Sequence, residues 1–166
     1  MPLAICGVHE VPAFAAVPLD HIVSFRETHQ PGPDIRGFQH EFTLHSFVFA
    51  DTGDPANPLA PKEAGVRRLL GLYAQTRLDQ SILFHCFAGV SRSSAAAFLW
   101  LVHHGAPYAD AYQVVVNVRG PFVCPNQLMV TLADQIMRLD GEMAAFMAAE
   151  TAKRVPERAA WFAAHK

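Results

Sequence analysis

Apolar positions along the chain recur with two different periods, one typical of buried strands and one typical of helices. Short apolar runs with strand composition occur at residues 3–6, 21–25, 41–50 and 81–84. Segments rich in Pro, Gly and Asp follow two of these runs, at 29–37 and 51–61, and we expect them to be loops. The segment 7–20 has room for a short helix or a turn.

Helical spacing of apolar residues predicts most of the remaining elements. One helix is expected after Pro61, a residue that suits a first helical turn. Another is expected from about Ser91 to His104, and because it is apolar on every side it should lie deep in the core. Three consecutive valines in the segment 108–120 would suit a strand, but the spacing of its other apolar residues favours a helix.

The C-terminal part of the chain is expected to be helical as well. Asn126 is a good N-cap for a helix over residues 125–139. The Ala-rich tail, about residues 141–166, should form a further helix, with a kink or a break at Pro156.

Strands that alternate with helices indicate an α/β fold with a central, mostly parallel sheet flanked by helices on both faces. The chain has 166 residues and neither internal repeats nor charge blocks, so we expect a single domain over residues 1–166. Ligands of such sheets bind outside the carboxyl ends of the strands, and Cys86 lies at one of these ends.

Composition and charge exclude several classes of protein. A hydrophobic fraction of 51% is too high for a disordered chain. The net charge of −2 offers no field for nucleic acid or for an anionic membrane surface, so we expect neither as a partner. The longest apolar run is too short to cross a bilayer. None of the nine histidines forms a ligand set with a third partner, so no metal site is expected.

Cysteine usage and the N-terminal sequence favour a cytoplasmic location. The three cysteines, Cys6, Cys86 and Cys124, are sparse and lack CxxC spacing, which suits a reducing compartment. No basic residue precedes Arg26, so the start of the chain makes a poor secretory signal.

The segment HCFAGVSRS, residues 85–93, joins the last strand to the buried helix. Gly89 gives the backbone the freedom for a tight loop there. Such a loop would direct its amide N–H groups inward, beside the positive end of the helix, and so form a cradle for a dianion. The residues of this cradle would be Phe87, Ala88, Gly89, Val90, Ser91 and Arg92.

Two side chains of this segment add chemistry to the cradle. The planar guanidinium of Arg92 can hold two phosphoryl oxygens at once. In the same field the thiolate of Cys86 is favoured over the thiol, which would make it a nucleophile at neutral pH. The hydroxyl of Ser93 would donate to that sulfur and ease its later departure.

The segment resembles the signature H-C-x-x-G-x-x-R-[ST] of the cysteine-dependent protein tyrosine and dual-specificity phosphatases, with every fixed position filled. This resemblance implies a phosphomonoester hydrolase that forms a phosphocysteine on Cys86 and needs no cofactor. Its substrate would be a phosphorylated protein or a small phosphomonoester. His85 would orient the loop and tune the thiolate.

The resemblance also implies a general acid on a separate loop, because an alkoxide or phenolate leaves poorly unless it is protonated. The segment FADTGDP offers Asp51 and Asp54. Asp51 directly follows a strand and precedes Thr52, which is the arrangement that the resemblance to dual-specificity phosphatases leads us to expect, so Asp51 is favoured, but both stay open. The segment VCPNQLM looks like the V-x-P-N segment of small dual-specificity enzymes, which implies that Asn126 braces the phosphate loop.

Two alternatives stay open beside the phosphatase interpretation. One is a non-catalytic phosphate-binding module, and the other is a rhodanese-like sulfurtransferase, against which the complete arginine-serine ending argues. The variable positions of the loop carry no positive charge. Since polyphosphorylated inositol substrates usually need extra cations, phosphotyrosine or mixed phosphoprotein substrates are preferred, and a small aryl phosphate also fits.

Overall fold

The computed structural model describes the backbone of residues 3–164 and the side chains of residues 3–154. Four strands form one parallel sheet in the order β1-β4-β2-β3. The strands are β1 (Leu3–Gly7), β2 (His21–Arg26), β3 (Thr43–Val48) and β4 (Ile82–Cys86). All four match runs that the sequence pattern predicts, so the expected parallel α/β architecture is confirmed.

Helices follow β1, β3 and β4 along the chain, whereas a loop alone joins β2 to β3. A short 3-10 helix, η1, follows β1, and five α-helices follow later in the chain. They are η1 (Val8–Phe14), α1 (Glu63–Tyr73), α2 (Arg92–His103), α3 (Tyr108–Arg119), α4 (Gln127–Met137) and α5 (Glu142–Ala164).

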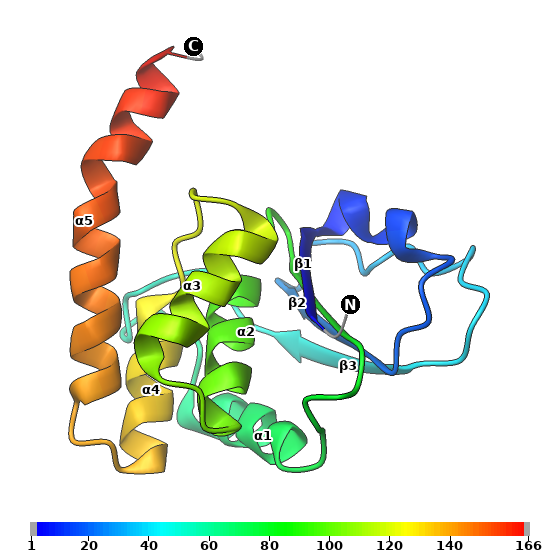
Figure 1. The fold of residues 1–166 in the computed structure, drawn as a ribbon, viewed down its shortest axis with the longest axis horizontal. Coiled ribbons are helices and arrows are strands. Elements are labelled where there is room, and N and C mark those ends of the chain that lie inside the picture. The colour runs from blue at the N-terminus through cyan, green and yellow to red at the C-terminus, as the bar shows by residue number, and fades with distance from the viewer. Residues whose placement is uncertain (1–2, 165–166) are drawn as a thin grey trace.

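Both faces of the sheet are covered, but by different kinds of structure. The α-helices gather on one face (Figure 1), where Ile5, Phe25 and Phe84 join the larger core. On the opposite face, Ile22 and Leu83 pack with residues of η1 and of the loops around it. The predicted second helical layer is therefore a 3-10 helix with loops.

Helix α2 is the central helix of the larger core. Every residue from Arg92 to Trp100 is buried, as the unbroken apolar pattern predicts. Three consecutive alanines, residues 95–97, have no exposed surface, and their small side chains let neighbouring elements approach closely. Only residues 87–91 separate the start of this helix from the end of β4.

The boundaries of three other helices differ in detail from their sequence patterns. The segment 108–120 is helical over most of its length, as predicted. Helix α1 begins at Glu63 with Lys62 as its N-cap, so Pro61 lies before the first turn. Helix α5 continues through Pro156, so of the two predicted outcomes, a kink or a break, the break does not occur. The last two residues of the predicted tail, 165–166, lie outside the described residues. Within the described part of the chain, no helix combines the length and apolar character needed to cross a membrane.

Candidate active site

The loop between β4 and α2, residues 86–92, passes directly over the end of β1. Cys86 ends β4 and pairs with Gly7 of β1. Gly89 has φ +72°, and a Cβ there would lie 2.4 Å from the carbonyl carbon of Cys6. Only glycine fits this position, for its backbone conformation and for its contact with β1.

The carbonyl groups of this loop point outward. Each carbonyl oxygen from Phe87 to Ser91 accepts a hydrogen bond from a donor on the outer side of the loop. The donors are the backbone N–H groups of Val8, Cys124, Asn126 and Ala95, the hydroxyl of Ser94 and the guanidinium of Arg119. No peptide bond is cis in the described chain, so an outward carbonyl turns the next N–H inward. The N–H groups of residues 88–92 therefore converge on one side of the loop.

The sulfur of Cys86 lies at the base of these N–H groups, and its residue is only 1% exposed. Its Sγ is 3.3 Å from Ser93 Oγ and accepts a hydrogen bond from the Gly89 N–H at 3.2 Å. Burial raises the pKa of Cys86, but the Ser93 hydroxyl, the backbone amides of Ser93 and Ser91 and the charge of Arg92 together lower that pKa below its usual value. The thiolate is therefore more favoured at this position than it is in an ordinary cysteine.

The two neighbouring groups, His85 and Cys6, stay uncharged near neutral pH. Burial, with the charge of Arg92 added, lowers the pKa of His85 to about 4. Cys6 pairs with His85 across the sheet, and burial, with Glu10 nearby, raises the pKa of the Cys6 thiol to about 12. Of these three groups, Cys86 alone has a pKa shifted toward its charged form.

Arg92 is buried and faces the loop that carries Asp51. Its Nη1 donates to the carbonyl oxygen of Phe49 at 2.9 Å, and its Nη2 donates to Gln30 Oε1 at 3.4 Å. Its Nε lies 3.8 Å from Asp51 Oδ2. No sequence pattern indicates the carbonyl of Phe49 or the amide of Gln30, because each contributes through the path of its loop.

Asp51 is tied to the 86–92 loop, whereas Asp54 is not. Asp51 Oδ1 accepts hydrogen bonds from Ser91 Oγ at 2.6 Å and from Asn126 Nδ2 at 2.9 Å. Asp54 is exposed and closes its own turn, where its Oδ1 accepts from the N–H of Ala56. The two candidate acids thus have different surroundings: Asp51 contacts the 86–92 loop, and Asp54 contacts the backbone of its own turn.

Asn126 has two partners at once. Its Oδ1 accepts from the N–H of Met129 at 3.1 Å, so it caps α4 as predicted. Its Nδ2 donates to Asp51 and to the carbonyl of Thr52. The start of α4 and the Asp51 loop are joined by this single side chain.

Arg119, at the end of α3, is a residue that the sequence reasoning missed. Its Nη2 donates to the carbonyl of Ala88 and its Nε to the carbonyl of Gly89, both at 3.0 Å. Its Nη1 donates to Glu10 Oε1, also at 3.0 Å. A cation in the last turn of a helix is so common that nothing in the sequence marks this one.

A cavity of about 560 Å³ opens beside the 86–92 loop. Its walls come from the Asp51 loop, the 86–92 loop, the start of α4 and one residue of α5. They are formed by Asp51, Thr52, Gly53, Ala88, Val90, Ser91, Cys124, Pro125, Asn126, Gln127 and Thr151. This lining contains neither lysine nor arginine.

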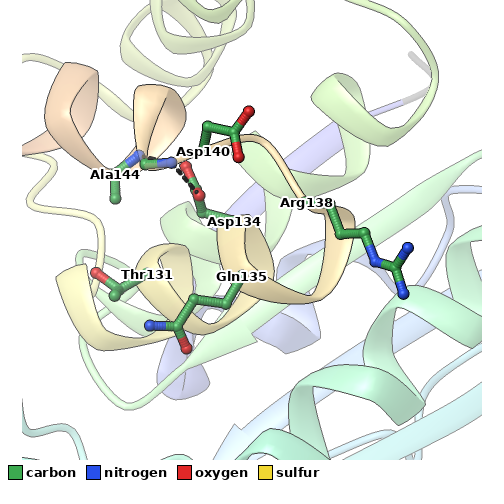
Figure 2. Close-up of a pocket in the computed structure, with 7 residues that line it drawn as sticks. Thr131, Asp134, Gln135, Arg138, Asp140 and Ala144 are labelled. Carbon is green, nitrogen blue, oxygen red and sulfur yellow. Dashed lines mark hydrogen bonds between the residues drawn. The ribbon is translucent and has the colours of Figure 1, made fainter.

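A second cavity, of about 550 Å³, lies between α4 and the start of α5 (Figure 2). Asp134 is buried there and accepts hydrogen bonds from the N–H groups of Gly141 and Ala144, which Figure 2 marks with dashed lines. This carboxylate therefore provides the hydrogen-bond acceptors for two backbone N–H groups where the chain turns into α5. None of the residues singled out in the sequence lines this cavity.

Comparison with known proteins finds its matches among solved structures. Human tyrosine phosphatase-like serine/threonine/tyrosine-interacting protein matches with a TM-score of 0.62 and 19% identity, over 84% of this chain and 93% of that chain. Human DUSP28 matches with a TM-score of 0.62 and 23% identity, over 83% and 89%. DUSP15 matches with a TM-score of 0.60 and 18% identity, over 90% and 92%. No family model and no curated protein sequence matches the chain.

Proposed function

We propose that this chain, which has the fold of the dual-specificity phosphatases, is a single-domain enzyme that hydrolyses phosphomonoesters through a phosphocysteine on Cys86. One observation carries the proposal. A thiol whose pKa is lowered lies at the base of a ring of converging N–H groups, next to a buried arginine. Such a ring complements a phosphoryl dianion, and the sulfur lies where a nucleophile must lie.

In the first step, the thiolate of Cys86 attacks phosphorus. An S–P bond forms, the P–O ester bond breaks, and the leaving oxygen takes a proton from a carboxylic acid. The N–H groups of residues 88–92 and the guanidinium of Arg92 hold the three equatorial oxygens, whose charge they stabilise as the transition state forms.

In the second step, water attacks the phosphocysteine. The carboxylate formed in the first step accepts the proton of this water, an O–P bond forms, and the S–P bond breaks. Cys86 leaves as a thiolate, stabilised by the Ser93 hydroxyl at 3.3 Å, and inorganic phosphate is released. The cycle balances without a metal or a redox partner.

Arg92 has N–H groups that are available to donate to an oxyanion. Its Nε makes no hydrogen bond within the described residues, and its contact from Nη2 to Gln30 is long, at 3.4 Å. A buried guanidinium N–H without a hydrogen bond is costly, and a phosphoryl oxygen would satisfy it better than Asp51 Oδ2, which lies 3.8 Å from Nε.

Asp51 is the acid that this mechanism uses. Its hydrogen bonds to Ser91 and Asn126 hold its carboxyl at the rim of the 86–92 loop, where a leaving oxygen would lie. Asp54 instead accepts a hydrogen bond within its own turn, from the N–H of Ala56.

The lining of the neighbouring cavity favours substrates with one phosphate. Since lysine and arginine are missing from its walls, a second phosphate there would meet no countercharge. Phosphoproteins and aryl phosphates fit this lining. All three cysteines are free, and a reducing compartment such as the cytoplasm would keep the nucleophile active.

Hydrolysis of p-nitrophenyl phosphate tests the proposal, together with tungstate binding as a probe of the ring of N–H groups. We expect Cys86→Ser to abolish hydrolysis and to retain tungstate binding, while Cys6→Ala keeps both. Tungstate binding without hydrolysis by the unaltered chain would favour a non-catalytic phosphate-binding module. Activity toward thiosulfate alone would favour sulfur transfer.

A further inference from the structure

One peptide group of the 86–92 loop connects Arg119 to the nucleophilic sulfur. The carbonyl of Ala88 accepts from Arg119 Nη2 at 3.0 Å. The N–H of the same peptide group, which belongs to Gly89, donates to Cys86 Sγ at 3.2 Å. A guanidinium thus lies at one end of a planar trans peptide, and the sulfur lies at the other end.

This arrangement affects the strength of the N–H donor. A cation at a carbonyl oxygen draws electron density through the conjugated amide, so its N–H becomes a better donor to a thiolate or to an oxyanion. Arg119 also binds the next carbonyl, that of Gly89, through Nε at 3.0 Å. Two consecutive peptides of the loop are therefore held by one guanidinium.

The orientation of these peptides is not fixed by covalent geometry. Gly89 adopts φ +72°, and glycine has access to other conformations in which the 88–89 peptide is reversed. In a reversed peptide the carbonyl oxygen would face the thiolate and any bound anion, which is unfavourable. A cation outside the loop opposes that reversal, because it stabilises outward carbonyl groups.

Glu10 holds the guanidinium in place. Its Oε1 accepts from Arg119 Nη1 at 3.0 Å, and its Oε2 lies 2.9 Å from Nη2. Glu10 Oε2 also accepts from the N–H of Gly7, the residue that pairs with Cys86 across the sheet. A two-oxygen contact of this kind fixes the plane of an arginine better than a single contact does. Glu10 thereby links η1 to the end of α3.

We propose that Arg119, oriented by Glu10, is a positioning residue that keeps the 88–89 peptide with its N–H toward the sulfur and toward the bound phosphoryl group. The inference rests on the proposed phosphatase function, since it assigns to Arg119 the positioning of a peptide group in the proposed active site. It predicts that the thiolate and the anion site both depend on a side chain that contacts neither of them.

The test compares Arg119→Ala, Arg119→Lys and Glu10→Gln with Arg67→Ala. Arg67 also forms an ion pair, with Glu63, but on an exposed face of α1. Three quantities are measured in each variant: the pKa of Cys86 from its ultraviolet thiolate absorbance, the affinity for tungstate, and kcat/KM for p-nitrophenyl phosphate. Unfolding in urea checks that each variant is folded.

We expect Arg119→Ala to raise the pKa of Cys86 and to weaken both tungstate affinity and kcat/KM by about tenfold, the loss of one charge-assisted hydrogen bond. The values for Arg119→Lys should lie between those of Arg119→Ala and those of the unaltered chain, since an ammonium group cannot bind both carbonyls in the same way. Glu10→Gln should shift the same quantities in the same direction. Added guanidinium ion should restore part of the activity of Arg119→Ala, and Arg67→Ala should match the unaltered chain.

The outcomes separate this inference from the proposed function. If the unaltered chain hydrolyses nothing, the proposed function fails, while the pKa of Cys86 and the tungstate affinity still report on Arg119. If the pKa of Cys86 and tungstate affinity are unchanged in folded Arg119→Ala, the inference is wrong. Should that variant not fold, unchanged values in Arg119→Lys and Glu10→Gln would overturn it equally.

Discussion

The side-chain amide of Asn126 donates to the carboxylate of Asp51 at 2.9 Å, although 75 positions separate the two residues in the sequence. Asp51 belongs to the loop after β3, and Asn126 caps α4. Their contact brings the loop of the proposed acid to the 86–92 loop, which Asp51 also meets through the hydroxyl of Ser91. The position of the acid therefore depends on where α4 begins.

Exchange of each aspartate tests which one is the acid. We expect Asp51→Asn to lower kcat by about a hundredfold, because general acid catalysis is lost. The loss should be larger for phenyl phosphate than for p-nitrophenyl phosphate, since phenolate is the poorer leaving group. Asp54→Asn keeps an acceptor for its turn and should behave like the unaltered chain. An equal loss in both variants, or none in Asp51→Asn, would remove Asp51 from this role.

Two variants of Asn126 separate helix capping from contact with Asp51. Asn126→Ala removes both and should lower the free energy of unfolding by about 1 kcal/mol, the usual effect of a lost N-cap. Asn126→Ser can still cap α4 but lacks the amide that donates to Asp51. We expect Asn126→Ser to keep most of the free energy of unfolding but to lose nearly as much activity as Asn126→Ala loses. If activity follows stability in both, the contact with Asp51 has no role of its own.

Ser93 should set the pH at which the thiolate forms. Its hydroxyl is the strongest of the groups that lower the pKa of Cys86, so Ser93→Ala should raise that pKa. The thiolate is the reactive form and exists above the pKa, so activity falls as pH falls through it. In the variant this loss should therefore occur at higher pH. The rate of alkylation by iodoacetamide as a function of pH, corrected with Cys86→Ser, measures the shift; an unchanged midpoint would contradict the assignment.

Gly89 should tolerate substitution less than another glycine with positive φ. Gly105 has φ +92° and open space around it, so Gly105→Ala should cost only the backbone strain, about 1–2 kcal/mol. Gly89→Ala adds a clash, because its Cβ would lie 2.5 Å from the nitrogen of Gly7. We expect it to lower the unfolding free energy further and to abolish tungstate binding. Equal destabilisation of the two variants in urea would show that the contact with β1 is unimportant.

The sequence indicates those parts of the site that have fixed local spacing. The segment 85–93 places Cys86 and Ser93 around one turn between a strand and a helix, and a single sequence can reveal such a pattern. Asn126 is recognisable because capping is also local. In the structure Cys86 contacts Ser93, while Asp51 contacts Asn126 and, through Ser91, the same loop.

Other contributions depend on how distant elements meet. Arg119 and Glu10 are 109 positions apart, and neither residue type is unusual where it stands. The carbonyl of Phe49 carries no sequence signal at all, since every residue has a carbonyl. Pro156 illustrates a different limit: a proline in a helical pattern predicts a kink or a break without deciding between them, and α5 continues through Pro156 without a break.

Rapid quenching of the enzyme in acid during turnover of p-nitrophenyl phosphate, followed by peptide mass spectrometry, tests the central claim most directly. The account predicts a phosphoryl group on the sulfur of Cys86, and its absence together with loss of turnover in Cys86→Ser. A phosphoryl group on any other residue, or continued hydrolysis by Cys86→Ser, would contradict the account.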